Sequence, residues 1–359
     1  MSKYKITVYA ICKNEKNNVK EWYNSMKEAD EIVVLDTGSD DGTYELLKKI
    51  PKIKAIQKVI IPWRFDSARN LSLSYVSKDT DICVCTDLDE RFEVGWRQVL
   101  EENWTKETTR GKYLYNWSFK NGKPATTFYI NKIHTLQNYR WINAVHEVLE
   151  STTKENEIII PGIVLNHYQD FNKSRSAYLT LLELSVKENP NNDRNVHYLG
   201  REYMYYKKWN KAIETLHNHL LLKSATWKDE RCASMRYLGY CYLNKSYLEE
   251  AIMWYEKSIK EAPYLREPYF DLGYLYYSIK DYEKSEKYLK KALKIKNKSF
   301  SYINEEQAWN DTIYDILSLS CFYNKKYKQA LNYLKIAISL NPECERLKNN
   351  LEIIKSYTI

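Results

Sequence analysis

The stretch DICVCTDLDE, residues 81–90, runs from an apolar, β-favouring segment straight into a group of acidic side chains. The segment ICVC is typical of a buried strand. Asp87 and Asp89 lie two residues apart, so in an extended chain they project to the same side. Two carboxylates at the end of a strand suit a divalent cation that bridges a diphosphate. A solvated acidic turn is the alternative, because short Asp-x-Asp sequences are common by chance.

Strands and helices are predicted to alternate on the N-terminal side of this stretch. Apolar runs rich in β-favouring residues begin at positions 6, 31 and 54 (ITVYAI, EIVVLD and KAIQKVII), and helices are predicted over 18–29, 42–49 and 66–76. Such alternation predicts an α/β domain with a mostly parallel sheet. Ligands of these sheets bind at the carboxyl ends of the strands, so the polar residues that follow each strand are candidates for a site.

Polar residues follow the first and second predicted strands. Asp36 begins the sequence Asp-Thr-Gly-Ser and could hydrogen-bond a base or a ribose, whereas an ordinary turn with Asp40 or Asp41 as the N-cap of the next helix is the structural alternative. Asn14 and Glu15 come directly after the first strand. The glycine-rich sequences of Rossmann dinucleotide-binding proteins and of P-loop proteins do not occur, which argues against both classes.

The sequence DSARN, residues 66–70, is predicted to begin a helix with Asp66 as its N-cap. Arg69 then lies in the first turn, close to other loop ends. There it could hold a phosphate, orient Asp87, or pair locally at the surface.

Two short segments further along the chain carry a carboxylate and a histidine after apolar runs. Glu147 lies in Val-His-Glu, and a carboxylate beside a sugar site could take a proton from an acceptor hydroxyl or thiol. His167 lies in Asn-His-Tyr at the end of IIIPGIVLNH, a natural position for a metal ligand. A structural histidine is the alternative, because a lone histidine is more often satisfied by its neighbours.

The second half of the chain repeats one helical pattern four times from about Asp193 to the end. Each copy has a small anchor preceded by a leucine, a small residue twelve positions later and a large one sixteen later, and the anchor spacings are 39, 34 and 45. Small residues at fixed places allow two antiparallel helices to pack closely. The pattern resembles tetratricopeptide repeats, whose unit is 34 residues. The anchors are Gly200, Gly239, Gly273 and Ser318.

Composition sets further limits. The 359 residues, 44% of them hydrophobic, suffice for two domains, and we expect neither a membrane span nor a signal peptide. Seven cysteines, an odd number in a long chain, predict no disulfide framework and a reducing, cytoplasmic location. Residues 1–170 carry no net charge and residues 171–359 carry all of the +8. No dense basic run or zinc-ligand spacing occurs, so nucleic acid is not an expected partner.

These segments, taken in order, resemble the family 2 glycosyltransferases of GT-A fold. The resemblance runs from the N-terminus to about Tyr168, and Asp-x-Asp-Glu after a hydrophobic strand and Ala-Arg-Asn before it are its most telling parts. Val-His-Glu, Asn-His-Tyr and a repeat domain are similar to a bacterial branch with C-terminal tetratricopeptide repeats, which includes enzymes that glycosylate bacteriocin peptides. The implied architecture is an α/β GT-A type nucleotide-sugar-binding domain (1–170), a helical linker (171–192) and an all-α tetratricopeptide-repeat solenoid (193–359).

The resemblance also implies roles for single residues. Asp36 would contact the nucleotide base, with Asn14 and Glu15 lining the same pocket. Arg69 would lie near the diphosphate and Asp87 would contact ribose or metal. Asp89 and His167 would bind the metal and Glu147 would be the catalytic base.

The sequence thus predicts a metal-dependent inverting hexosyltransferase. The expected donor is a nucleotide-diphospho-sugar of the UDP-hexose type, and the expected cofactor is Mn²⁺ or Mg²⁺, with a histidine ligand favouring Mn²⁺. The expected partner is a peptide or protein acceptor bound by the repeats, with a homodimer through the repeats as a further option. The alternatives are a cell-surface polysaccharide or lipid-linked acceptor, and a non-catalytic repeat interaction protein.

In standard repeat geometry, one face of the helices would line a concave groove for that acceptor. A tyrosine at helical spacing is more often packing than recognition, and the chain has 33 tyrosines. The residues predicted to face the groove are Arg201, Tyr205, Tyr240, Asn244, Tyr274, Tyr277 and Phe322.

Overall fold

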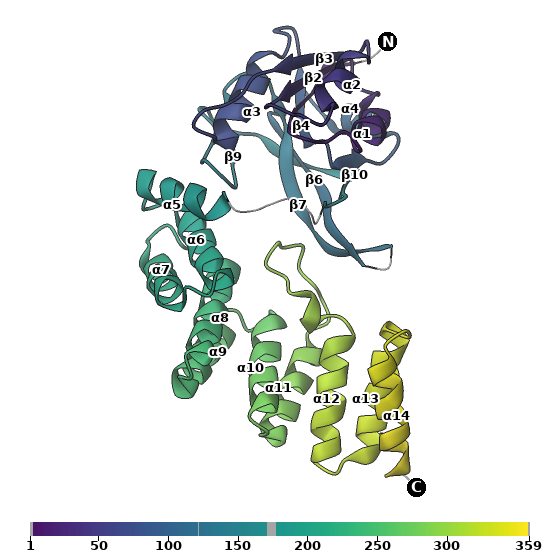
Figure 1. The fold of residues 1–359 in the computed structure, drawn as a ribbon, viewed down its shortest axis with the longest axis vertical. Coiled ribbons are helices and arrows are strands. Elements are labelled where there is room, and N and C mark those ends of the chain that lie inside the picture. Colours follow the sequence, from purple (N-terminus) through teal and green to yellow (C-terminus); the bar gives the residue numbers. More distant parts are fainter. Residues whose placement is uncertain (1–2, 121, 171–176, 358–359) are drawn as a thin grey trace. The chain divides into compact units, whose positions relative to one another are not determined.

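The computed structural model describes residues 3–120, 122–170 and 177–357. The chain divides into two compact units, Met1–Ser185 with Phe300–Tyr302, and Val186–Ser299 with Ile303–Ile359 (Figure 1). The first unit is a mixed α/β domain and the second is all-helical, which confirms the predicted fold class.

The first unit is built on strands that together form one large sheet and one small one. Their bounds are β1 (Ile6–Cys12), β2 (Glu31–Asp36), β3 (Ile53–Gln57), β4 (Ile82–Asp87), β5 (Glu90–Phe92), β6 (Arg110–Lys120), β7 (Lys123–Thr135), β8 (Tyr139–Ile142), β9 (Val148–Ser151) and β10 (Glu157–His167). The large sheet has the order β3-β2-β1-β4-β7-β6-β10-β5, and β8 pairs with β9. Strands β1 to β4 are parallel, whereas β7 is antiparallel to both β4 and β6.

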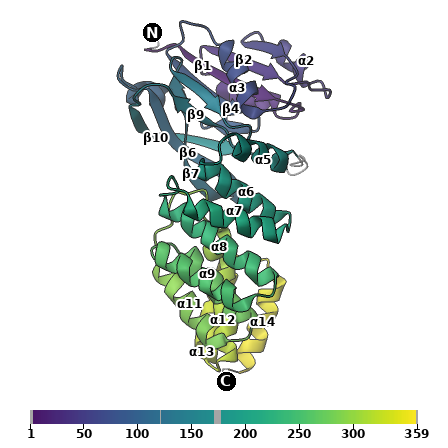
Figure 2. The ribbon, with the colours of Figure 1, turned by 90° about the vertical axis from the view of Figure 1, so that its left-hand side faces the viewer.

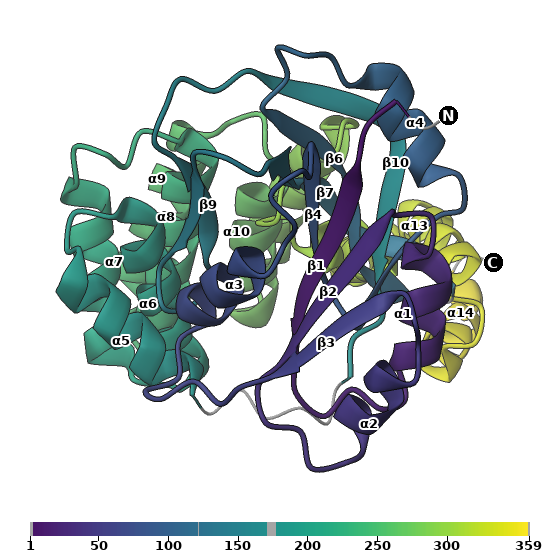
Figure 3. The same ribbon diagram turned by 90° about the horizontal axis from the view of Figure 1, so that it is seen from above.

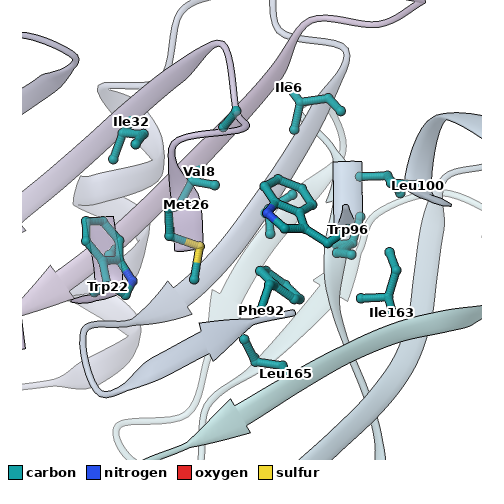
Figure 4. Close-up of a cluster of buried hydrophobic side chains, with 14 of the residues drawn as sticks. Ile6, Val8, Trp22, Met26, Ile32, Phe92, Trp96, Leu100, Ile163 and Leu165 are labelled. Atoms are coloured by element: carbon teal, nitrogen blue, oxygen red, sulfur yellow. The ribbon is translucent and has the colours of Figure 1, made fainter. Parts of the chain in front are cut away.

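Helices cover both faces of the parallel part of this sheet (Figure 3). The helices that precede the repeats are α1 (Val19–Met26), α2 (Thr43–Lys48), α3 (Phe65–Ser74), α4 (Trp96–Asn103) and α5 (Tyr178–Glu188). Successive side chains of a strand point to opposite faces. Val8 therefore belongs to one buried cluster with Trp22 of α1 and Trp96 of α4, whereas Tyr9 belongs to another with Leu73 of α3. Figure 4 shows the first of these two clusters.

Two local predictions in this unit are wrong. Helix α3 begins at Phe65 with Arg64 at the N-cap position, so Asp66 is not the N-cap; its carboxylate instead accepts from the Ser67 amide (2.7 Å) and pairs with Arg64. The third strand, predicted over 54–61, ends at Gln57. Among the described strands it pairs only with β2, whose last residue lies opposite Gln57, so no neighbouring strand remains to extend the ladder.

The second unit is a series of antiparallel helix pairs (Figure 2). The pairs are α6 (Asp193–Tyr205) with α7 (Trp209–Leu221), α8 (Lys228–Asn244) with α9 (Leu248–Glu261), α10 (Glu267–Ser278) with α11 (Tyr282–Lys294) and α12 (Asp311–Tyr323) with α13 (Tyr327–Leu340); η1 (Glu306–Ala308) precedes the last pair and α14 (Glu345–Ser356) follows it. Each predicted anchor lies on the first helix of its pair.

The close approach predicted at the anchors is present. A Cβ on Gly200 would lie 2.6 Å from the Leu216 side chain, and one on Gly273 would lie 2.8 Å from Leu289. Real Cβ atoms do not come that close, so glycine is required for the two helices to touch. Ser318, the exception, donates its hydroxyl to the Ala330 carbonyl at 2.9 Å. The four-fold pattern therefore corresponds to four helix pairs.

Candidate active site

The predicted polar motifs meet at the carboxyl ends of the parallel strands. Central strand β1 has β2 on one side and β4 on the other, and its last residues lie opposite Asp36 (next to Cys12) and Asp87 (next to Ile11). The strand register therefore places the two aspartates on either side of a single strand end, at the sheet edge where ligands of α/β proteins bind.

Asp36 organises the turn that follows β2. One of its oxygens, Oδ1, accepts from the amides of Gly38 (3.0 Å) and Ser39 (2.9 Å) and from Gln57 Nε2 (3.0 Å). Burial opposes its charge, but these hydrogen bonds prevail and hold the pKa of Asp36 below its ordinary value. Gly38 has φ 107°, a conformation that favours glycine. Asp36 is therefore a fixed, ionised acceptor at the base of this loop.

Asn14 and Glu15 form the facing loop after β1. The Asn14 side chain and Asp40 exchange two hydrogen bonds, at 2.9 and 3.0 Å. The amide of Glu15, a buried residue, donates to Thr43 Oγ1 at 2.8 Å, and its carboxylate accepts from Asn18. The structure thus brings both residues beside the Asp36 loop, where they tie the two loops together. Contact with a nucleotide base stays a prediction for all three.

Arg69 is the centre of a buried ionic cluster. Only 3% exposed, it reaches both oxygens of Asp87 from Nη2 (2.9 and 3.0 Å), Glu147 Oε1 from Nε, and Cys85 Sγ from Nη1 (3.3 Å). Its guanidinium also lies 5.1 Å from the Trp141 ring. The sequence left three roles open for Arg69, and these contacts match the one in which it orients Asp87. The contact with Glu147 was not indicated by the sequence.

The neighbouring Asn70 explains how Glu147 reaches this cluster. Its side chain donates to the Trp141 carbonyl (2.8 Å) and accepts from the Trp141 amide (2.8 Å). These two hydrogen bonds fix β8 against α3, and the chain that leaves β8 then delivers Glu147 to Arg69. Two adjacent residues of the Ala-Arg-Asn motif therefore act together. Asn70 binds the backbone of Trp141, and Arg69 binds the carboxylate of Glu147.

Glu90, the last residue of the Asp-x-Asp-Glu motif, and Lys132, which the sequence analysis did not single out, complete the cluster. Glu90 is 1% exposed and accepts from the Asp87 amide at 2.9 Å, and Lys132 Nζ lies 3.3 Å from Glu90 and 3.5 Å from Asp87. Burial opposes the charge of Asp87, but Arg69 and Lys132 together hold its pKa well below the ordinary value. Burial raises the pKa of Glu90 despite the nearby Lys132. The cluster thus combines three carboxyl groups with two cations.

Asp89 and His167 face one another beside the cluster. His167 Nε2 lies 3.6 Å from Asp89 Oδ2, and its Nδ1 is 3.0 Å from the Trp117 carbonyl. A metal-binding histidine commonly donates its other ring N–H to such a carbonyl, which leaves the facing nitrogen to coordinate. The pair has the donor atoms of a divalent-cation site, and its role as a metal site stays a prediction. Asp87, the third predicted ligand, has both oxygens turned to Arg69.

The residues predicted to face an acceptor groove differ in their surroundings. Tyr205, Tyr240 and Tyr274 are about half exposed. Tyr277 and Phe322 are partly buried, and Phe322 packs edge-to-face on Tyr357. Asn244 is exposed and donates to the Tyr240 carbonyl, and Arg201 lies 4.5 Å from the Tyr198 ring. Acceptor binding by this set stays a prediction.

Two family models match the chain. Residues 7–148 match the model described as glycosyl transferase family 2, and residues 238–264 and 267–299 match the tetratricopeptide repeat. The matches confirm the predicted order, an N-terminal family 2 domain followed by repeats.

Similar proteins are found for parts of the chain. The lipopolysaccharide core biosynthesis glycosyltransferase LpsC of Rhizobium meliloti (strain 1021) is 30% identical over 102 residues, which are 28% of this chain and 37% of LpsC. This chain thus covers little more than a third of that relative. The family 2 match and LpsC together support the expected enzyme class, a glycosyltransferase.

Solved structures with similarity include MamA, at 20% identity and a TM-score of 0.37 over 47% of this chain and 83% of MamA. A thermophilic TPR protein from Thermus thermophilus has 20% identity and a TM-score of 0.37 over 50% of this chain and 89% of its own.

Among the described residues, no helix is both long and apolar enough to cross a membrane. Each of the seven cysteines is free.

Proposed function

We propose that the protein is a metal-dependent inverting glycosyltransferase that moves a hexose from a nucleotide-diphospho-sugar, a UDP-hexose, to a side chain of a peptide or protein. The observation that carries the proposal is the juxtaposition at one sheet edge of the Asp89–His167 pair with the Arg69–Asp87–Glu147 cluster. The arrangement supports the proposal because two side chains with metal-ligand atoms lie near a carboxylate that could serve as a base.

Asp89 and His167 would hold the cation, with Asp87 beside them for metal or ribose. A bound divalent cation would neutralise the charge that develops on the leaving diphosphate. The mixture of a carboxylate with an imidazole favours Mn²⁺ over Mg²⁺. The donor nucleotide would be bound at the Asp36 loop, where a fixed carboxylate and the Asn14 and Glu15 loop offer hydrogen-bonding groups.

Glu147 would take the proton of the acceptor group. As the acceptor atom forms its bond to the anomeric carbon, the bond from that carbon to the diphosphate oxygen breaks, and attack from the opposite side inverts the configuration. Arg69 Nε donates to Glu147 and so orients its carboxylate. A base that is held in position by a neighbouring cation needs less reorientation before it takes the proton.

The repeats would bind the acceptor through exposed aromatic and basic residues, in keeping with the positive charge of residues 171–359. Binding on the same chain raises the local concentration of the acceptor. We place this activity in the cytoplasm. A lipid-linked or polysaccharide acceptor is the second candidate, because the relative LpsC is described as a lipopolysaccharide core enzyme.

The test of the proposal is a donor-hydrolysis and transfer assay with a panel of nucleotide sugars and Mn²⁺. Asp89→Asn should abolish metal-dependent turnover in a folded protein, whereas Asp79→Asn, at an exposed aspartate outside the site, should not. Full activity of Asp89→Asn, or of the unaltered chain in excess EDTA, would refute the metal role. Transfer only to glycans in a mixed panel would favour the second candidate.

A further inference from the structure

A second group of metal-ligating side chains lies at the N-terminal end of the repeats and shares no residue with the proposed active site. Asp193 is at the start of α6, His219 near the end of α7 and Glu230 in the first turn of α8. One ligand atom from each lies within 4.8 Å of the other two. His219 is fully buried and Glu230 is 4% exposed. Three helices therefore direct a carboxylate, an imidazole and a second carboxylate to one point.

The ring of His219 is held in the orientation that a ligand needs. Its Nδ1 lies 2.9 Å from Ser234 Oγ, and the same hydroxyl lies 2.8 Å from Nδ1 of His197. Nε2 lies 3.3 Å from Glu230 Oε1 but makes no hydrogen bond with the described residues. A buried polar atom without a hydrogen bond is rare and calls for an explanation.

Ser234 can donate to only one of the two rings that it contacts, since a hydroxyl has a single proton. If the serine donates to His197, His219 donates from Nδ1 and presents the Nε2 lone pair to the two carboxylates. Without a cation, the Nε2 lone pair would face carboxylate oxygens, which is electrostatically unfavourable. A bound cation requires this same tautomer of His219. Fixing one ring nitrogen through a hydrogen bond while the other coordinates is the usual arrangement around metal ions.

We propose that Asp193, His219 and Glu230 bind a divalent cation of the Zn²⁺ type, with water as the fourth ligand. Ligand atoms about 2.0–2.2 Å from a tetrahedral ion lie about 3.5 Å apart. The ligand atoms would thus have to move closer by roughly 1 Å at their widest separation when the ion binds. The ion would join α6, α7 and α8, and so brace the N-terminal end of the repeats.

The competing explanation is charge compensation by arginine. Arg194 and Arg201 act electrostatically on His197, next to this group. In that case His219 would carry its proton on Nε2, so that an N–H group and not a lone pair faces Glu230. No cation would then be needed between them. The two explanations differ in whether the folded chain takes up one metal ion through His219.

The experiment is calorimetric titration of Zn²⁺ into the full chain after chelator treatment, in an Asp89→Asn background that removes the other proposed metal site. We expect one ion per chain and a higher melting temperature with Zn²⁺. His219→Gln should weaken the affinity at least tenfold. His217→Gln, on the same helix but partly exposed and in contact with Tyr242 and Trp254, is the matched control and should bind as the background does.

Asp193→Asn provides a second variant should His219→Gln fail to fold, because Asp193 is only partly buried at a helix start. It should also weaken Zn²⁺ binding at least tenfold while its circular dichroism stays unchanged. No ion bound in the Asp89→Asn background, or affinity equal to that background in the folded Asp193 and His219 variants, would overturn the proposal. Since transfer activity is not the readout, this result is independent of the proposed function.

Discussion

His134 is a buried histidine whose ionisation should control the acid stability of the catalytic unit. It is fully buried; its Nε2 lies 2.8 Å from the Tyr9 hydroxyl and its Nδ1 is 2.7 Å from the Thr135 carbonyl. Trp141 Nε1 donates to the same Tyr9 hydroxyl at 2.8 Å. Burial lowers the pKa of His134 to about 4. The neutral ring is therefore part of the support beneath Trp141, which contacts Arg69.

The size of the effect follows from linkage. An unfolded histidine has a pKa of about 6.5, so between about pH 6.5 and pH 4 the unfolded chain binds a proton at this ring that the folded chain does not. The free energy of unfolding should then fall by about 1.4 kcal/mol per pH unit in this window as the pH is lowered, about 3 kcal/mol in all. This contribution is complete above pH 6.5 and is lost on acidification.

The perturbation is His134→Gln, which removes the titration and keeps a polar side chain. Urea unfolding of the unaltered chain and of the variant, followed by tryptophan fluorescence at pH 7, 6, 5 and 4, gives the difference in unfolding free energy at each pH. That difference should change by about 3 kcal/mol from pH 7 to pH 4. In spectra of the chain labelled at histidine Cε1, the one signal of six that the variant loses should not titrate above about pH 5. Parallel pH profiles of the two proteins would refute the reasoning.

Three further results are expected. Glu147→Gln should lower kcat by roughly 10²–10⁴-fold while donor affinity, measured by direct binding, barely changes; loss of donor binding instead would make Glu147 a donor contact. Gly239→Ala should destabilise the protein by about 1–3 kcal/mol in urea unfolding, because the new Cβ would lie 2.9 Å from the Tyr255 ring, and an unchanged midpoint would contradict the close packing. Replacing Arg201, Tyr240 and Tyr274 together by alanine should raise the KM for a peptide acceptor many-fold while donor hydrolysis and the melting temperature stay the same; an unchanged KM would exclude acceptor binding by these residues.

The parts of the fold that depend on local periodicity could be predicted from the sequence. The four parallel strands follow from apolar runs separated by helical patterns, and the helix pairs follow from anchors such as Gly200 and Gly273, whose contacts lie sixteen residues further along. The edge of the sheet where Asp36 and Asp87 meet follows from the same alternation. In each case the residues in contact are close in sequence, or their positions follow from the rule that parallel strands end at the same edge of the sheet.

The ionic cluster could be predicted only in part, because its contacts join distant segments. Lys132 comes from β7, an antiparallel strand inserted between β4 and β6, and it lies 45 residues from Asp87 in sequence. Arg69 and Glu147 are 78 residues apart. No period connects such pairs, and the register of antiparallel strands with bulges, as between β6 and β7, is not evident from hydrophobic pattern alone. The sequence indicated Arg69 with Asp87 as one possible partner, but it did not indicate the contacts with Glu147 and Lys132.

The position of Arg69 between Asp87 and Glu147 has a consequence for how the two substrates would affect one another. One guanidinium serves a carboxylate on the proposed donor side and a carboxylate on the proposed acceptor side. A ligand that moves Asp87 away from Arg69 changes how the guanidinium holds the Glu147 carboxylate, and so changes the position of the proposed base. Thermodynamic linkage makes any such coupling mutual, so that acceptor binding at Glu147 alters donor affinity by the same factor as donor binding alters acceptor affinity. Donor and acceptor would then bind with positive or negative cooperativity through the Arg69 side chain, which need not contact either substrate.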